Sequence, residues 1–298
     1  MSSPSTRSSS LHSRGAAIAW MSGALVSFLT MAISSRELSA ELTIVQILFL
    51  RSLLCLSLLG FIILVLGVRR PGAHWGFGRI LTRAPSLHLV RNTVHWASQY
   101  AWTFAAVSIP LAEVFAIEFT SPIWTALIAT FVLGERLNRW RLVAIALGFV
   151  GTMIILRPGV AVIHPASFSA LAAAVGFAIT YVVTKKLVSI EYPIAILFWM
   201  NVTQLLLGAV PAALLWVSPT SAMWPWIAAL GIAGLSSHYC LSRALRCADA
   251  TVVAPMDFLR LPVAAVVAWL MYAEALDPFV FIGAVIIFTG NWIGIRRG

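Results

Sequence analysis

Long apolar stretches, separated by short polar or proline-containing turns, run through almost the whole chain. Each is long enough to cross the hydrocarbon core of a bilayer, which takes about 20 mostly apolar residues in a helix. The pattern predicts an all-α membrane protein with ten transmembrane helices. We place these helices at 15–34, 42–67, 86–107, 109–133, 141–157, 166–186, 192–217, 224–246, 249–271 and 278–296.

Composition agrees with this pattern. The 298 residues have a mean hydropathy of +0.94, 60% are apolar and only 10% are charged. A water-soluble domain of this length could not bury that much apolar surface. Residues 1–14 are rich in serine and poor in large apolar side chains, so we expect a disordered tail before the first helix.

The basic residues lie mainly in alternate turns, and this asymmetry predicts the orientation. If the N-terminus is cytoplasmic, the outer turns contain only Arg36 and Arg157, while the inner turns contain most of the other arginines and the lysines. Basic residues are enriched in the cytoplasmic turns of membrane proteins, so we expect both termini in the cytoplasm. The expected membrane is the plasma (bacterial inner) membrane. The net charge of +10 is therefore interpreted as an orientation signal and not as a nucleic-acid surface.

An internal repeat aligns residues 98–159 with 237–298 without a gap, at a shift of 139 positions. The first repeat is predicted at 15–159 and the second at 165–298, with five helices in each. An odd number of helices means that the two repeats insert with opposite orientation, as in many secondary transporters. Identities in this register include polar, aromatic and glycine positions: Tyr100 with Tyr239, Phe119 with Phe258, Glu135 with Glu274, Gly151 with Gly290 and Arg157 with Arg296.

Glu118 and Asp257 are the sharpest functional signal, because they are repeat mates inside apolar helices. They lie roughly 13 and 12 Å from the nearer helix ends at 1.5 Å per residue. A charge at that depth costs several kcal/mol on insertion scales. Arg260, one turn beyond Asp257, and Arg51 in the second helix are mid-depth cations. We interpret these charges as a cavity for a zwitterionic or charged metabolite, with one acid exchanging a proton; the alternative is a structural ion-pair network.

A polar and aromatic stripe follows one face of the helix at 86–107. It contains Arg91, His95, Ser98, Gln99 and Trp102. Polar side chains that face lipid are costly, so we expect this stripe to face a cavity or another helix. Arg91 is expected to reach the cytoplasmic interface. For His95 a proton relay and a helix-to-helix hydrogen bond both remain open.

Aromatic residues accompany the stripe. Trp96 and Tyr100 lie in the same helix, and Tyr239 is the repeat mate of Tyr100. These rings are candidates for stacking on a planar substrate, and ordinary packing is the alternative.

Prolines and glycines mark special positions in the helices. Prolines that interrupt the fourth and ninth helices are expected to create bends or gates: Pro110, Pro122, Pro255 and Pro262. Small residues are expected at close helix contacts: Gly148, Gly151, Gly283 and Gly290.

Several segments resemble the EamA-type transporters of the drug/metabolite transporter superfamily. They include Thr120-Ser121-Pro122, Phe131-Val132-Leu133-Gly134-Glu135-Arg136-Leu137, Leu156-Arg157-Pro158-Gly159, Arg260-Leu261-Pro262 and Tyr272-Ala273-Glu274. The resemblance implies two five-helix repeats around a central cavity, alternating access and no ATP hydrolysis. The stretch from Asp257 to Pro262 is similar to S-adenosylmethionine or riboflavin importers of the family, and aromatic amino-acid exporters are the competing analogy. Substrate and direction stay open.

Three classes of function are open to a membrane protein with these features. A secondary carrier of a small organic metabolite fits best, and a flippase for lipids or lipid-linked head groups is the alternative. A membrane enzyme would need a metal-ligand cluster or a nucleophile with its base, and the sequence contains no such motif. We therefore expect no catalytic residues, no metal and no cofactor. The expected partners are a small molecule and the lipid bilayer, with no nucleic acid, and a monomer is compatible with the sequence.

Overall fold

The computed structural model describes residues 5–69, 80–133, 139–157, 163–187, 189–247 and 256–297. Over these ranges the regular elements are all helical, as predicted. Because α4 and α5 form one interrupted rod, the described α-helices make ten rods. The helices are α1 (Ser5–Ser39), α2 (Ile44–Arg69), α3 (Pro85–Ser108), α4 (Leu111–Glu118), α5 (Ser121–Leu133), α6 (Arg139–Leu156), α7 (Pro165–Leu187), α8 (Pro193–Leu214), η2 (Ser221–Met223), α9 (Trp224–Cys247), α11 (Arg260–Tyr272) and α12 (Pro278–Arg297).

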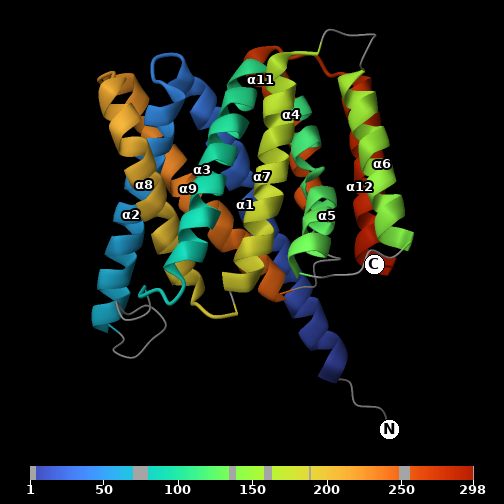
Figure 1. The fold of residues 1–298 in the computed structure, drawn as a ribbon, viewed down its shortest axis with the longest axis horizontal. Helices are drawn as coiled ribbons and strands as arrows, with labels where there is room; N and C mark the ends of the chain where they lie inside the picture. The colour runs from blue at the N-terminus through green and yellow to red at the C-terminus, as the bar shows by residue number, and fades with distance from the viewer. Residues whose placement is uncertain are drawn as a thin grey trace.

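The beginning of α1 and the end of α12 lie at the same end of the bundle (Figure 1). We call this the proximal end and the opposite one the distal end. Helix α1 begins at Ser5, so the segment expected as a disordered tail is largely helical, with residues 1–4 outside the described ones. Once the apolar part of α1 has formed, each further residue extends the helix at little cost, which composition alone did not reveal.

Five helices are long and apolar enough to cross a membrane by themselves, at Gly15–Ser39, Ile44–Val65, Leu111–Val132, Pro165–Leu187 and Ile194–Leu214. Two shorter apolar helices lie at Leu142–Leu156 and Pro278–Gly294. The expectation that all ten stretches are individually apolar enough is thus too strong. Helix α3 has a row of polar side chains, which lowers the mean hydropathy of the helix. These side chains are buried against other helices and so do not face lipid. The protein is a multi-pass helical membrane protein.

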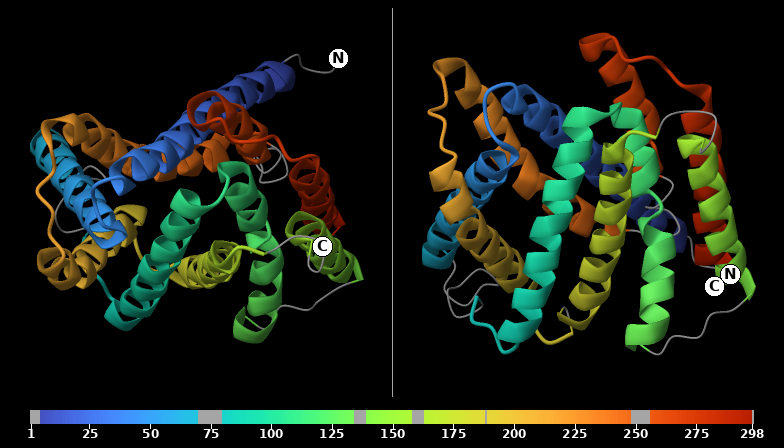
Figure 2. Two further views of the ribbon diagram at one scale, coloured as in Figure 1. Left: turned by 90° about the horizontal axis from the view of Figure 1, so that it is seen from above. Right: turned by 45° about the horizontal axis from the view of Figure 1, so that its top comes forward.

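The helices pack in pairs that combine the two halves of the chain. Helix α1 packs along α9, α3 along α7, α2 along α8 and α6 along α12. Seen from above, α2 and α8 lie at one flank, and α6 and α12 lie at the other (Figure 2). Neither half could bury these helix faces without the other.

The predicted close contacts at glycines are confirmed. A Cβ atom on Gly151 of α6 would lie 2.6 Å from the carbonyl oxygen of Gly283 in α12, and the converse distance is also 2.6 Å. Gly148 lies against Ile123, and Gly290 lies against the backbone of Ala144. Backbones approach this closely only where side chains are missing.

Two of the predicted proline interruptions coincide with helix breaks. The rod of α4 and α5 is broken between Glu118 and Ser121. Pro122 has no N–H to donate to the carbonyl oxygen of Glu118 four residues earlier, so the helix cannot continue regularly there. The helical stretch 256–258 is likewise interrupted just before α11, which contains Pro262. Pro255 lies outside the described residues.

Candidate functional site

Two carboxylates and one guanidinium meet at the helix breaks; we call Glu118, Asp257 and Arg260 the acid cluster. The Nη2 atom of Arg260 donates to Oε1 of Glu118 at 3.2 Å and to Oδ2 of Asp257 at 3.3 Å. The side chain of Arg260 is only 5% exposed. Glu118 ends α4 and Arg260 begins α11, so the two breaks bring the predicted residues together.

The two carboxylates differ in how far their hydrogen bonds are satisfied. Nε1 of Trp102 donates to the second oxygen of Glu118 at 2.7 Å. The second oxygen of Asp257 is buried and has no hydrogen-bond partner among the described residues. With three formal charges, the cluster has a net charge of −1 and one open acceptor.

Aromatic rings enclose the guanidinium of Arg260. Its Cζ lies 4.6 Å from the ring centroid of Phe28, 5.0 Å from that of Phe115 and 5.1 Å from that of Phe119. Phe119 also stacks on Phe258 with ring centroids 4.2 Å apart. Cation–π contacts of this kind hold a guanidinium in place without neutralising it.

Arg51 lies in a separate cluster, which corrects the idea that two acids and two cations neutralise one another in one network. Its Nη2 atom donates to the side-chain oxygens of Gln99 and Gln204, the latter at 2.8 Å. In the part of the chain that the structure describes, no carboxylate forms an ion pair with it. We call Arg51, Gln99 and Gln204 the Arg51 cluster. Sequence reasoning missed Gln204, although a glutamine inside an apolar helix is itself a signal.

The stripe on α3 is buried, as expected, but its members have different surroundings. Both ring nitrogens of His95 are buried without a hydrogen-bond partner among the described residues, so the helix-to-helix hydrogen bond is not formed there. The hydroxyl of Ser98 donates to the carbonyl oxygen of Val94, and Ser98 packs against Gly176 of α7. Two members of the stripe reach the clusters: Gln99 belongs to the Arg51 cluster, and Trp102 donates to Glu118 of the acid cluster.

Arg91 does not extend to the surface of the bundle as predicted. It is buried and donates to side-chain oxygens of Thr184 and Asn92. The polar partners on α3 and α7 replace the water that the predicted snorkelling would have supplied.

The predicted aromatic residues are not brought to either cluster. Tyr100 and Tyr239 are 39% and 40% exposed, and Tyr100 shares its face of α3 with the exposed Phe104. The ring of Trp96 lies 6.2 Å from that of Tyr100, and its Nε1 is buried without a partner among the described residues.

At the distal end, several links join the two halves; we call them the distal network. Arg36 of α1 pairs with Glu274 and also donates to the carbonyl oxygens of residues 106 and 109. Tyr272 donates to Glu37 at 2.9 Å, and Arg157 pairs with Asp277. A pocket of about 410 Å³ opens beside them, and Arg36, Tyr272 and Glu274 contribute to its wall.

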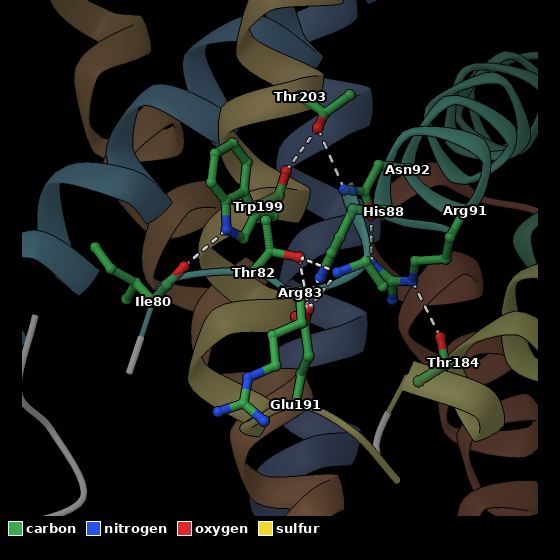
Figure 3. A network of polar contacts seen from close by, with 11 residues as sticks. Ile80, Thr82, Arg83, His88, Arg91, Asn92, Thr184, Glu191, Trp199 and Thr203 are labelled. Atoms are coloured by element: carbon green, nitrogen blue, oxygen red, sulfur yellow. Dashed lines mark hydrogen bonds and ion pairs between the residues drawn. The ribbon is translucent and has the colours of Figure 1, made fainter. Parts of the chain in front are cut away.

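At the proximal end, one carboxylate gathers several contacts between the halves, beside separate hydrogen bonds from Asn92 to Thr203 and from Trp199 to Ile80 (Figure 3). Glu191, just before α8, accepts hydrogen bonds from the hydroxyl of Thr82 and from the N–H groups of Arg83 at 2.8 Å and Ala84 at 3.1 Å, and it contacts Nε2 of His88. We call these five residues the proximal network. Burial alone would raise the pKa of Glu191, but these hydrogen bonds outweigh it and hold the pKa below its usual range.

The sequence alone predicted no role for Glu191. The available signal was an acidic residue just before a helix that begins with proline. Both α8 and α3, whose start lies near Glu191, begin in this way. Over the described ranges, no group of three histidine, cysteine or acidic side chains gathers into a metal site.

Comparisons with known proteins agree with this architecture. The sequence model of the EamA-like transporter family matches residues 15–157 and 164–295. An S-adenosylmethionine uptake transporter of Rickettsia bellii is 28% identical over 271 residues, covering 91% of this chain and 90% of that protein. A riboflavin transporter of Rhizobium johnstonii is 30% identical, covering 74% of each chain.

An exporter is among the similar proteins as well. The pseudopaline exporter CntI of Pseudomonas aeruginosa is 26% identical and covers 85% of this chain and 86% of its own. A crystal structure with 17% identity matches with a TM-score of 0.63, covering 94% of this chain and 96% of that one, which shows the fold. With both halves matched by the family model, the chain belongs to the EamA-like transporter family.

Proposed function

We propose that the protein is a secondary active transporter that moves a small organic metabolite by alternating access, with a proton exchanged at the acid cluster. Its membrane is the bacterial inner membrane, and its proximal end faces the cytoplasm. The names of its relatives support a metabolite as substrate. The excess of basic residues in the turns at the proximal end supports this orientation.

Two inverted repeats, at 15–159 and 165–298, are part of this proposal. The helix pairs support them, because α1 with α9 and α7 with α3 are equivalent pairs under the repeat. The helix breaks agree: α5 begins at Ser121 and α11 at Arg260, which are 139 positions apart. Two such halves can rock against each other around a central site.

The single observation that carries the proposal is the charge of the acid cluster. Two carboxylates share one buried arginine, which leaves one negative charge and one unpartnered oxygen on Asp257. An unpaired charge in the membrane interior is costly, and binding a proton or a cationic group removes it. Alternate binding of these two is the physical basis of coupled transport.

The networks at the two ends support alternating access. Each joins residues of both halves across the bundle, at Arg36 and Glu274 distally and at His88 and Glu191 proximally. Opening one side requires breaking the network there while the other stays intact.

Transport by purified protein in liposomes tests the proposal, with S-adenosylmethionine, riboflavin and amino acids as probes and with and without a pH gradient. Glu118→Gln and Asp257→Asn should abolish uptake driven by the gradient. Glu113→Gln is the matched control, because Glu113 lies on the same helix and accepts a hydrogen bond from Ser167 outside the cluster. Gradient-driven uptake that persists in both cluster variants contradicts proton exchange there. Movement of labelled lipid head groups instead of solutes would indicate the flippase alternative.

A further inference from the structure

We propose that the Arg51 cluster is a binding subsite for a carboxylate group of the transported molecule. The inference rests on the proposed transport function and adds a substrate class to it. The substrate would carry a carboxylate for the Arg51 cluster and an amine or other cationic centre for the acid cluster.

The first observation is an arginine without a counter-ion. Arg51 is 5% exposed, and over the described ranges its partners are the neutral side-chain oxygens of Gln99 and Gln204. Removing an arginine from water costs several kcal/mol, and neutral acceptors offset less of that cost than a carboxylate does. The site is therefore electrostatically incomplete without an anion.

The second observation is a donor that lacks an acceptor beside this cation. The side-chain oxygen of Gln204 accepts from Arg51 at 2.8 Å and from Ser52 at 3.4 Å. Its amide nitrogen is buried and has no hydrogen-bond partner among the described residues. Turning the amide over would not relieve this, because it would direct N–H groups at the guanidinium. A carboxylate can accept from both Arg51 and Gln204 at once.

The third observation is the position of this cluster relative to the acid cluster. Gln99 contacts Arg51, and Trp102, three residues later on α3, contacts Glu118. Three residues correspond to about 4.5 Å along a helix and to the same face. A positive pole and a negative pole thus adjoin one turn of α3, an arrangement that suits a zwitterion. A purely structural Arg51 would link α2, α3 and α8 but would have no use for the open donor of Gln204.

Paired ligands that differ in the carboxylate test the inference. Binding to purified protein would be measured for S-adenosylmethionine and decarboxylated S-adenosylmethionine, and for each natural amino acid and its decarboxylated amine. The wild-type protein should bind at least one carboxylated compound about tenfold or more tightly than its partner. Arg51→Gln should remove this preference, and Arg51→Lys should restore part of it.

Gln204→Glu gives a second, independent test. It places a carboxylate beside Arg51, so it should remove the preference for carboxylated ligands while the thermal midpoint stays equal or rises. Arg91→Gln is the control for loss of a buried arginine, because Arg91 is bonded to Thr184 and Asn92. It should keep the wild-type preference.

The inference is overturned if no carboxylated compound in the panel binds better than its amine, or if the preference survives in Arg51→Gln. Transport of any probe by the wild-type protein would still support the proposed function in that case. A carboxylate preference in binding without transport of any solute would instead contradict the proposed function and leave the subsite in place.

Discussion

The two ends of the bundle hold the halves together in different ways. The distal network consists of three side-chain links, made by Arg36, Tyr272 and Arg157, and its Arg157–Asp277 pair is 33% and 30% exposed. The proximal network converges on Glu191, whose side chain is 2% exposed. Loss of Glu191 removes all the contacts that meet at its carboxylate, although the hydrogen bonds of Asn92 to Thr203 and of Trp199 to Ile80 remain beside it. Loss of one distal link leaves the other two in place. Glu191 is therefore the residue whose loss should remove the most contacts at once between the two halves.

Removing Glu191 should have the largest effect on stability. Glu191→Ala leaves His88 and the N–H of Arg83, just before α3, without this acceptor, and losing one partner of a buried pair costs about 3 kcal/mol. Unfolding of the purified protein in mixed micelles would measure the loss, and Glu191→Gln should retain part of the stability. Equal stability of Glu191→Ala and wild type contradicts the convergence.

Arg36 should come next, because three acceptors share its guanidinium. A double-mutant cycle of Arg36→Gln and Glu274→Gln should give a coupling energy of about 1–2 kcal/mol. Zero coupling would mean that the backbone contacts of Arg36, and not the ion pair, hold the distal end.

Acid should reduce the stabilisation that Glu191 contributes to the proximal network. The pKa of Glu191 lies below its usual range, so its stabilisation is complete above the ordinary glutamate pKa of about 4.3 and is lost as the pH falls through the lower folded value. Protonation keeps the carboxyl group in place, so the loss should be smaller than in Glu191→Ala. Thermal midpoints of wild type and Glu191→Gln from pH 7 to pH 3 would test this, with His88→Gln as the variant that removes the neighbouring titratable ring. A pH dependence that is equal in wild type and Glu191→Gln speaks against the assignment.

The Arg157–Asp277 pair should matter least. Exposed ion pairs contribute at most about 1 kcal/mol, and salt screens them. Arg157→Gln should therefore change the thermal midpoint little, and less still at high salt. A loss as large as that of Glu191→Ala would remove the difference between the two ends.

The sequence predicted those features that depend on local rules. The apolar lengths indicate the rods, and the break after Glu118 follows from the missing N–H of Pro122. The approach of Arg260 to Asp257 follows from a spacing of three residues. The approach of Glu118 to the same arginine was suggested by the repeat.

Other features depend on how helices turn toward one another, and spacing does not determine that. Arg51 meets Gln204 only because α2 packs along α8. Tyr100 and Gln99 are adjacent in sequence, yet one is exposed and the other buried, because successive residues point in directions about 100° apart. Glu191 contacts Thr82 and His88 from a turn, and hydrophobic periodicity does not predict the path of a turn.

The contact between Gly151 and Gly283 has a mechanical consequence. With only hydrogen atoms separating the two backbones, α6 and α12 form a seam that resists both sliding and spreading. A methyl group at either position would push the two helices apart. Because helices are rigid, the displacement would be transmitted to their ends. In the proposed alternating access, this contact would place the pivot of the motion at this flank and the largest displacements at the opposite flank, where α2 and α8 lie.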